Sequence, residues 1–264
     1  MKKVWVIIRK EWSEVFKNRL VLGTVAFLPL LFTAIPLVTL YYTGTGNNAD
    51  SAIAATDLPP QFAQLCGDLN GTECMQYYIV SQFLILFMLI PLILPMTFAS
   101  YSIVGEKRTH TLEPLLATPI TTFELLAGKA LAASIPGILA TWLAFLVYEI
   151  GARILAISPH VLARLSDPLW LIAIFISGPL LAIAAVSIAM MISSRVNEPR
   201  VAEQISALFV LPLVGLFIGQ STGLLLVNQT LIIYMTIGLI VLDAGLLAFA
   251  TQFFQRENIL TRWK

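Results

Sequence analysis

Long apolar stretches without any charged residue alternate with short charged segments along this chain. The uncharged stretches cover residues 20–49, 74–105, 130–148, 168–194 and 204–242. Each of the first four can hold one helix of about 20 apolar residues, the length that crosses the hydrocarbon core of a bilayer. With the apolar tail at 244–255, the fifth can hold two helices, separated by the polar residues 228–230. The pattern therefore predicts six transmembrane helices near residues 20–42, 78–104, 126–150, 169–193, 204–226 and 231–254.

Composition supports this prediction. Apolar residues make up 58% of the 264 residues, and charged residues only 12%. A soluble domain carries about 25% charged residues, so the outer surface of this chain is better suited to lipid than to water. Backbone amides in lipid must find partners within the protein, which favours helices. We expect an all-α membrane protein, with residues 1–264 forming one transmembrane domain.

The distribution of basic residues predicts the orientation. Short loops rich in Lys and Arg tend to remain in the cytosol. With the N-terminus inside, only Arg153 and Arg164 of the 16 basic residues fall outside. This places both termini in the cytosol and the protein in the cell membrane. A competing interpretation, a signal peptide cleaved near Ala52–Ala54, fits poorly because Glu11 and Glu14 precede an apolar run that is too long.

Residues 1–19 form a predicted amphipathic helix. Apolar side chains recur at helical spacing, and charged residues fill the positions between them. Such a helix suits the headgroup plane of the bilayer, although a plain basic anchor would have the same location. The apolar positions are Val4, Ile8, Trp12, Val15 and Phe16.

The segment 43–77 is predicted to be an extracytoplasmic loop. It contains four acidic residues, no basic residue, and both cysteines of the chain, Cys66 and Cys74. An oxidising compartment would allow these two to form a disulfide. The alternative is a pair of small unpaired hydrophobic residues.

The segment 105–125, between the second and third predicted spans, has features of a short amphipathic helix. Leu112, Leu115 and Leu116 fall near one helical face, Thr111 is a suitable N-cap, and Pro119 would end the helix. Held between two spans, such a helix could transmit force from a soluble partner or lie passively on the membrane. The pattern leaves both alternatives open.

Residues that carry chemistry are sparse. The chain has no phosphate-binding loop, since Gly128-Lys129 is followed by Ala130 and lacks the upstream glycine. The histidines His110 and His160 lie on opposite sides of the predicted membrane and cannot share a metal. Serines within the spans lack a neighbouring base. We expect no catalytic residue, metal or cofactor in this chain, and the net charge of +1 gives no reason to expect a nucleic-acid partner.

Asp243 is the one acid deep within a predicted span. Inserting an ionised Asp at the centre of a helix costs about 2.5–3.5 kcal/mol, so such residues usually face a bundle interior or a hydrated path. Asp243 could bind a cation, a proton or a polar substrate group. The simpler alternative is a protonated Asp that donates a hydrogen bond across a helix interface.

The segment 105–129 also resembles the permeases of type-2 ABC exporters. The resemblance is carried by Glu106-Lys107-Arg108, Thr111-Leu112-Glu113, Leu115-Leu116, Thr118-Pro119-Ile120, Glu124 and Gly128-Lys129. Two weaker matches are Arg9-Lys10-Glu11 and residues 256–260. The chain departs from the family pattern at Arg108, where a second Glu is usual, and at His110, where Gly is common.

The resemblance implies a fold and a mechanism. The fold would have six spans, an N-terminal interfacial helix, a coupling helix between spans two and three, and short re-entrant helices near the outer ends of spans five and six, which residues 219–228 could supply. Two permease chains, identical or related, would pair and bind two ATPase subunits, which hold ATP and Mg. The coupling residues would be Glu106, Thr111, Leu112, Glu113, Leu115, Leu116, Thr118 and Pro119.

Two other functions remain open at this point. One is a secondary transporter driven by an ion gradient through Asp243, although no internal repeat relates residues 20–150 to 169–254. The other is a membrane scaffold subunit that transports nothing.

Overall fold

The computed structural model describes residues 2–17, 19–45, 69, 71–108, 121–196 and 198–253. All regular structure within these ranges is helical. Six stretches are long and apolar enough to cross a membrane, which confirms the predicted number of spans. They are Val25–Thr45, Gly71–Ser102, Phe123–Leu155, Pro159–Arg195, Pro199–Ser221 and Gln229–Phe249.

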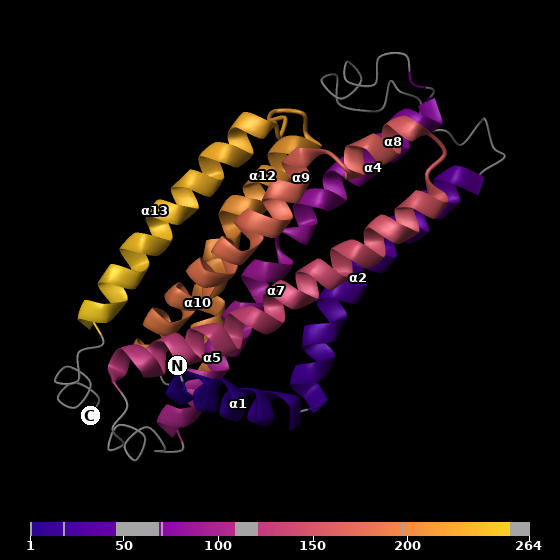
Figure 1. Cartoon of the computed structure of the whole chain (residues 1–264). Coiled ribbons are helices and arrows are strands. Elements are labelled where there is room, and N and C mark those ends of the chain that lie inside the picture. Colours follow the sequence, from indigo (N-terminus) through magenta and orange to yellow (C-terminus); the bar gives the residue numbers. More distant parts are fainter. Residues whose placement is uncertain are drawn as a thin grey trace.

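Several spans are built from more than one helix (Figure 1). A separate helix, α1 (Lys2–Lys17), lies across one end of the bundle, as expected for the predicted amphipathic segment. The first span is α2 (Arg19–Thr45), the third is α7 (Thr122–Leu155) and the sixth is α13 (Gln229–Phe253). The second span consists of α4 (Gly71–Phe87) and α5 (Ile90–Arg108), and the fifth of α11 (Pro199–Ala207), the 3₁₀-helix η3 (Leu208–Val210) and α12 (Leu211–Ser221). The fourth span consists of α8 (Pro159–Leu165), α9 (Pro168–Ile172), the π-helix η2 (Ala173–Ser177) and α10 (Gly178–Arg195).

The second span is the centre of the bundle. In its most apolar window 83% of the residues are buried, whereas the figure is 17% for the first, fifth and sixth spans. Helix α5 packs against both α7 and α10, while α2 packs on α7 and α13 on α10. The outer spans therefore expose large apolar side chains, such as Phe27, Leu30 and Tyr234, to the surroundings of the bundle. A lipid solvent accounts for this exposure.

Prolines divide three of the spans. A proline has no N–H to donate, and its ring clashes with the carbonyl four residues earlier. Pro91 follows a break at which Met88 N and Leu89 N bond to the carbonyls three residues back, at 3.0 Å each. Pro179 follows the π-helix η2, and Pro212 follows the 3₁₀-helix η3. Before Pro91 and Pro212 the helix is tighter than an α-helix for about one turn, and before Pro179 it is wider for about one turn.

Pro95 and Pro136 lie inside unbroken α-helices. One expectation about the spans is wrong. Residues 219–228 form no re-entrant helix, because α12 continues to Ser221 and a turn follows in which Gly223 has φ 75°. That positive φ is readily available only to glycine, so the chain reverses within a few residues and enters α13 at Gln229. Short helices occur instead at the start of the fourth span, at α8 and α9.

A close contact between α5 and α7 fixes the centre of the bundle. A Cβ placed on Gly137 of α7 would lie 2.5 Å from Cγ of Pro95 on α5. The proline ring therefore occupies the space that a side chain at position 137 would need. Small residues at such crossings let two helix backbones approach closely in a membrane.

We expect Gly137→Ala to destabilise the protein by about 1–3 kcal/mol, because the added methyl group overpacks the contact with Pro95. The measurement is the melting temperature of the detergent-solubilised chain. Gly215→Ala is the matched control, since a Cβ on that helical glycine meets nothing within 4 Å. Equal melting temperatures for the two variants would contradict the proposed crossing.

Candidate functional site

The predicted coupling residues lie largely outside the described part of the chain. Residues 109–120 fall in the gap between α5 and α7, and they include Thr111, Leu112, Glu113, Leu115, Leu116, Thr118 and Pro119. Glu106 belongs to α5, but its side chain is outside the description as well. Docking of an ATPase on these residues therefore stays a prediction. The structure does describe the two helices between which the segment runs.

Helix α7 begins directly after this segment with a capping box. The Glu124 N–H donates to Thr121 Oγ1 at 3.2 Å, and the Thr121 N–H donates to Glu124 Oε2 at 2.9 Å. Two backbone donors at the helix N-terminus are thus satisfied. Lys3 Nζ of α1 lies 3.8 Å from the same carboxylate. The first turn of α7 is therefore fixed, and α1 lies beside it.

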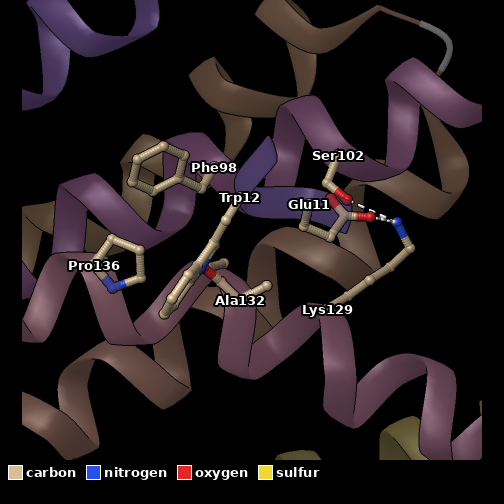
Figure 2. A pocket seen from close by; sticks show the side chains of 8 residues that line it. Glu11, Trp12, Phe98, Ser102, Lys129, Ala132 and Pro136 are labelled. Carbon is tan, nitrogen blue, oxygen red and sulfur yellow. Dashed lines mark hydrogen bonds and ion pairs between the residues drawn. The ribbon is translucent and has the colours of Figure 1, made fainter. Parts of the chain in front are cut away.

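A buried ion pair lies one turn further along α7 (Figure 2). Lys129 Nζ donates to Glu11 Oε1 of α1 at 2.9 Å and to Ser102 Oγ of α5 at 2.7 Å. Only 4% of the Lys129 side chain and 7% of the Glu11 side chain are exposed. Three helices that are separate in sequence are joined at one ammonium group.

A hydrogen bond and an apolar contact hold α1 in place beside this ion pair. The Trp12 Nε1–H donates to the carbonyl of Ala132 at 2.9 Å. Gly128 faces Ile7 so closely that a Cβ at position 128 would lie 3.0 Å from the Ile7 side chain. A cavity of about 10 Å³, with room for about one water molecule, borders the pair and is also lined by Phe98 and Pro136. The buried face of α1 thus packs on α7 along its length.

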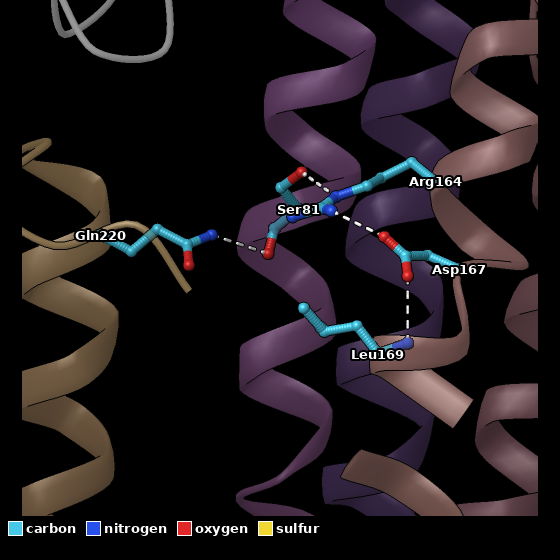
Figure 3. A network of polar contacts seen from close by, with 5 residues as sticks. All are labelled: Ser81, Arg164, Asp167, Leu169 and Gln220. Carbon is cyan, nitrogen blue, oxygen red and sulfur yellow. Dashed lines mark hydrogen bonds and ion pairs between the residues drawn. The ribbon is translucent and has the colours of Figure 1, made fainter. Parts of the chain in front are cut away.

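The opposite end of the bundle has its own polar network (Figure 3). Arg164 of α8 donates from Nε to Ser81 Oγ of α4 at 3.2 Å and from Nη1 to Asp167 Oδ2 at 3.0 Å. The Gln220 side chain of α12 donates to the Ser81 carbonyl at 3.1 Å. Asp167 also caps α9 through the Leu169 N–H. Ser81 therefore connects α4 to the fourth and fifth spans.

Aromatic rings surround the Arg164 guanidinium. Its Cζ lies 5.4 Å from the centre of the Tyr77 ring and 5.6 Å from that of Trp170. Only 14% of the Arg164 side chain is exposed. A cation between aromatic faces and a carboxylate can be buried at moderate cost. Arg164 thus has a packing role that charge counting alone does not indicate.

Gln76 joins three segments at the same end. Its side chain is fully buried. Its Nε2 donates to the Leu40 carbonyl of α2 at 3.2 Å, and its Oε1 accepts from the Ile157 N–H after α7 at 3.1 Å. The nearby Cys74 is buried and disulfide-bonded. The predicted pairing of Cys74 with Cys66 involves a residue outside the described ranges.

Asp243 lies on the face of α13 that packs on α10 and is only 5% exposed. Neither of its carboxylate oxygens has a hydrogen-bond partner among the described residues. Two turns away, Thr236 and Ser177 share a hydrogen bond of 2.7 Å across the same interface. Both interpretations of Asp243, a site for a cation, a proton or a polar substrate group and a hydrogen bond across a helix interface, stay predictions.

Comparison with known families decides what kind of membrane protein this is. The family model described as "ABC-2 family transporter protein" matches residues 5–252, nearly the whole chain. The chain belongs to the ABC-2 transporter family. No curated protein matches it. The predicted resemblance is confirmed, and the chain is a multi-pass membrane permease subunit of an ABC transporter.

The matched region of this ABC-2 permease includes both the amphipathic helix and the coupling segment. The family's membrane subunits are generally not catalytic, and the family implies an ATPase partner for the transporter. Among the described residues, no three His, Cys, Asp or Glu side chains are grouped so that they could hold a metal. The ion pair of Glu11 and Lys129 lies where α5 and α7 flank the segment 109–120, which makes it a candidate for a functional contact in this permease.

The sequence patterns did not single out this ion pair. Glu11 and Lys129 belong to two motifs that resemble the family, but nothing in the sequence indicated that they meet. A usable signal existed, because Lys129 lies inside a predicted span and Glu11 follows Ile7 and Ile8 by one turn on the apolar face of α1. A cation and an acid that each face apolar surroundings need a counter-charge. The Thr121–Glu124 capping box was likewise present as a Thr-x-x-Glu signature.

We expect Lys129→Met to destabilise the permease by about 3–5 kcal/mol, because it leaves the Glu11 carboxylate buried without its counter-ion. Adding Glu11→Leu should restore most of the lost stability, since an apolar pair can replace a buried ion pair. Melting temperatures of the single and double variants in detergent test this.

Lys3→Met is the matched control for Lys129→Met. It removes the partly exposed pair with Glu124 between the same two helices, where the loss should stay below about 1 kcal/mol. A double variant that melts at or below the temperature of Lys129→Met would contradict the buried pair.

Proposed function

We propose that this ABC-2 permease forms the membrane path of an ATP-driven exporter, as a pair of permease chains that bind two ATPase subunits. The observation that carries the proposal is the ion pair of Glu11 and Lys129, which with Ser102 joins the two helices at either end of the segment 109–120. A segment whose two ends are held together can pass a push to both spans at once. In this proposal that push comes from ATPase closure on ATP and Mg.

The distribution of charge supports an orientation with α1 in the cytosol. Most basic residues fall at the α1 end of the bundle, on α1 itself and at the ends of α5 and α10. A cytosolic position of this end follows from the positive-inside rule. The segment 109–120 then faces the compartment that contains ATP, and both termini lie in the cytosol of a cell-membrane protein.

Pairing of two permease chains is supported by the low burial of the outer spans. The first, fifth and sixth spans bury 17% of their apolar windows within one chain. Part of this apolar surface is available to a second copy or to a related permease, and the rest to lipid. The mass of the complex in nanodiscs tests the pairing: we expect two permease chains in each particle, and one chain in each particle would contradict it.

The docking prediction is tested by Leu116→Asp. A carboxylate on the predicted apolar face of the coupling segment should prevent burial against the ATPase, because an unpaired charge is costly to desolvate. We expect loss of copurification with a coexpressed ABC ATPase that binds the unchanged chain. Ala117→Asp is the matched control, since it places the same charge one residue further, off the face of Leu112, Leu115 and Leu116. A complex of full strength with Leu116→Asp would contradict the assignment.

A further inference from the structure

Glu11, Ser102 and Lys129 form a contact that we call the clasp, located at the base of the coupling segment. Ser102 lies on α5 shortly before that helix ends at Arg108, and Lys129 lies on α7 two turns after its start at Thr122. The chain between these two helices is the segment to which the proposed function assigns ATPase docking. Glu11 comes from a third helix, α1, which precedes the first span.

The clasp differs from the other ion pair between α1 and α7. Lys3 and Glu124 are 3.8 Å apart, with side chains 50% and 27% exposed, so water can replace either partner. Lys129 and Glu11 are 2.9 Å apart and nearly inaccessible. Separating them without water would leave two charges uncompensated in an apolar environment, which is strongly unfavourable. The exposed pair can open during a conformational change, whereas the clasp resists opening.

The surroundings of the clasp reinforce this difference. Ile7 lies against Gly128, one residue before Lys129, and Trp12, one residue after Glu11, bonds to the Ala132 carbonyl. The clasp therefore lies between an apolar contact on one side and a hydrogen bond between the same two helices on the other. Packed interfaces of this kind change between discrete arrangements and do not deform continuously.

We propose that the clasp makes α1 part of the transmission element, so that α1 and the adjoining ends of α5 and α7 move as one rigid unit when the coupling segment is displaced. Glu11 and Lys129 are then positioning residues, which act through the helices they join and touch neither ATP nor cargo. This inference rests on the proposed function and extends it from the coupling segment to the amphipathic helix. Motion of α1 would carry ATPase closure to the first span, since α2 begins at Arg19, two residues after α1 ends.

The test uses the full chain in complex with its ATPase, reconstituted in nanodiscs. Glu11→Gln and Lys129→Gln remove one charge each, and Lys3→Gln is the matched control on the exposed pair. The readout is the ATP turnover of the complex relative to the ATPase subunit alone, measured well below the melting temperature of every variant. In Glu11→Gln and Lys129→Gln we expect this ratio to change about tenfold, in the direction of the isolated ATPase, which is a usual size for coupling between sites. In the control, Lys3→Gln, the ratio should stay unchanged.

A covalent staple separates transmission from stability. Ile7→Cys with Gly128→Cys joins α1 to α7 beside the clasp, at a point where the two Cβ positions are 3.0 Å apart, close to the range of about 3.5–4.5 Å in disulfides. Oxidising the staple in Lys129→Gln should restore the turnover ratio to within about twofold of the unchanged chain, because rigid attachment substitutes for the ion pair. Reduction should remove the rescue, and the same oxidation and reduction of Lys129→Gln without the staple, which retains the disulfide of Cys74, should leave its ratio unchanged.

Two results would overturn the clasp proposal. One is an unchanged turnover ratio in Glu11→Gln and Lys129→Gln complexes. The other is loss of turnover when the staple is oxidised in the chain that retains Glu11 and Lys129, since α1 would then have to move against α7. Failure of the unchanged chain to copurify with the ATPase is a different outcome. It would overturn the proposed function, and the clasp's role in it, before any turnover is measured.

Discussion

The α1 end of this permease depends on the large free-energy cost of removing a charge from water. An isolated ammonium or carboxylate in an apolar environment is so unfavourable that Lys129 and Glu11 must stay together or become hydrated. Their 2.9 Å contact therefore determines more than its own geometry. It sets where α1 lies, and it sets the distance between the end of α5 and the start of α7. Apolar packing alone, without direction, would allow α1 to slide along α7.

The opposite end of the bundle meets a similar requirement in another way. Arg164 is also largely buried, but its charge is shared between Asp167, a serine hydroxyl and two aromatic rings. Gln220 reaches the same serine residue from the fifth span. Several weaker contacts can be exchanged one at a time, for each other or for water, whereas a single enclosed ion pair cannot. The two ends of the permease thus differ in how readily their helices can separate.

The spans could be predicted because lipid imposes a simple rule on sequence. Five uncharged apolar stretches and a short apolar tail predicted the six spans, and the spacing of Val4, Ile8 and Trp12 predicted the separate α1. The helix ends were less accurate, because α7 begins at Thr122 and α4 at Gly71, several residues before the predicted boundaries. Caps and polar contacts determine those ends, and hydropathy does not report on them. The contact between Glu11 and Lys129 could not be predicted from the sequence for a different reason. The two residues are 118 positions apart in the chain, and their contact depends on how their helices pack together.

The prolines within the spans act in different ways. Pro95 packs against Gly137 inside an intact helix, while Pro179 follows the π-helical turn at Ala173–Ser177. A π-helical turn accommodates one residue more than an α-helical turn, and each residue of an α-helix advances it by about 100°. The side chains of α10, which follows the π-helical turn, are therefore rotated about the helix axis relative to the positions that an uninterrupted α-helix from α9 would give them. In a related chain that lacks the extra residue, an ungapped alignment across this turn would assign every following side chain of α10 to the wrong face.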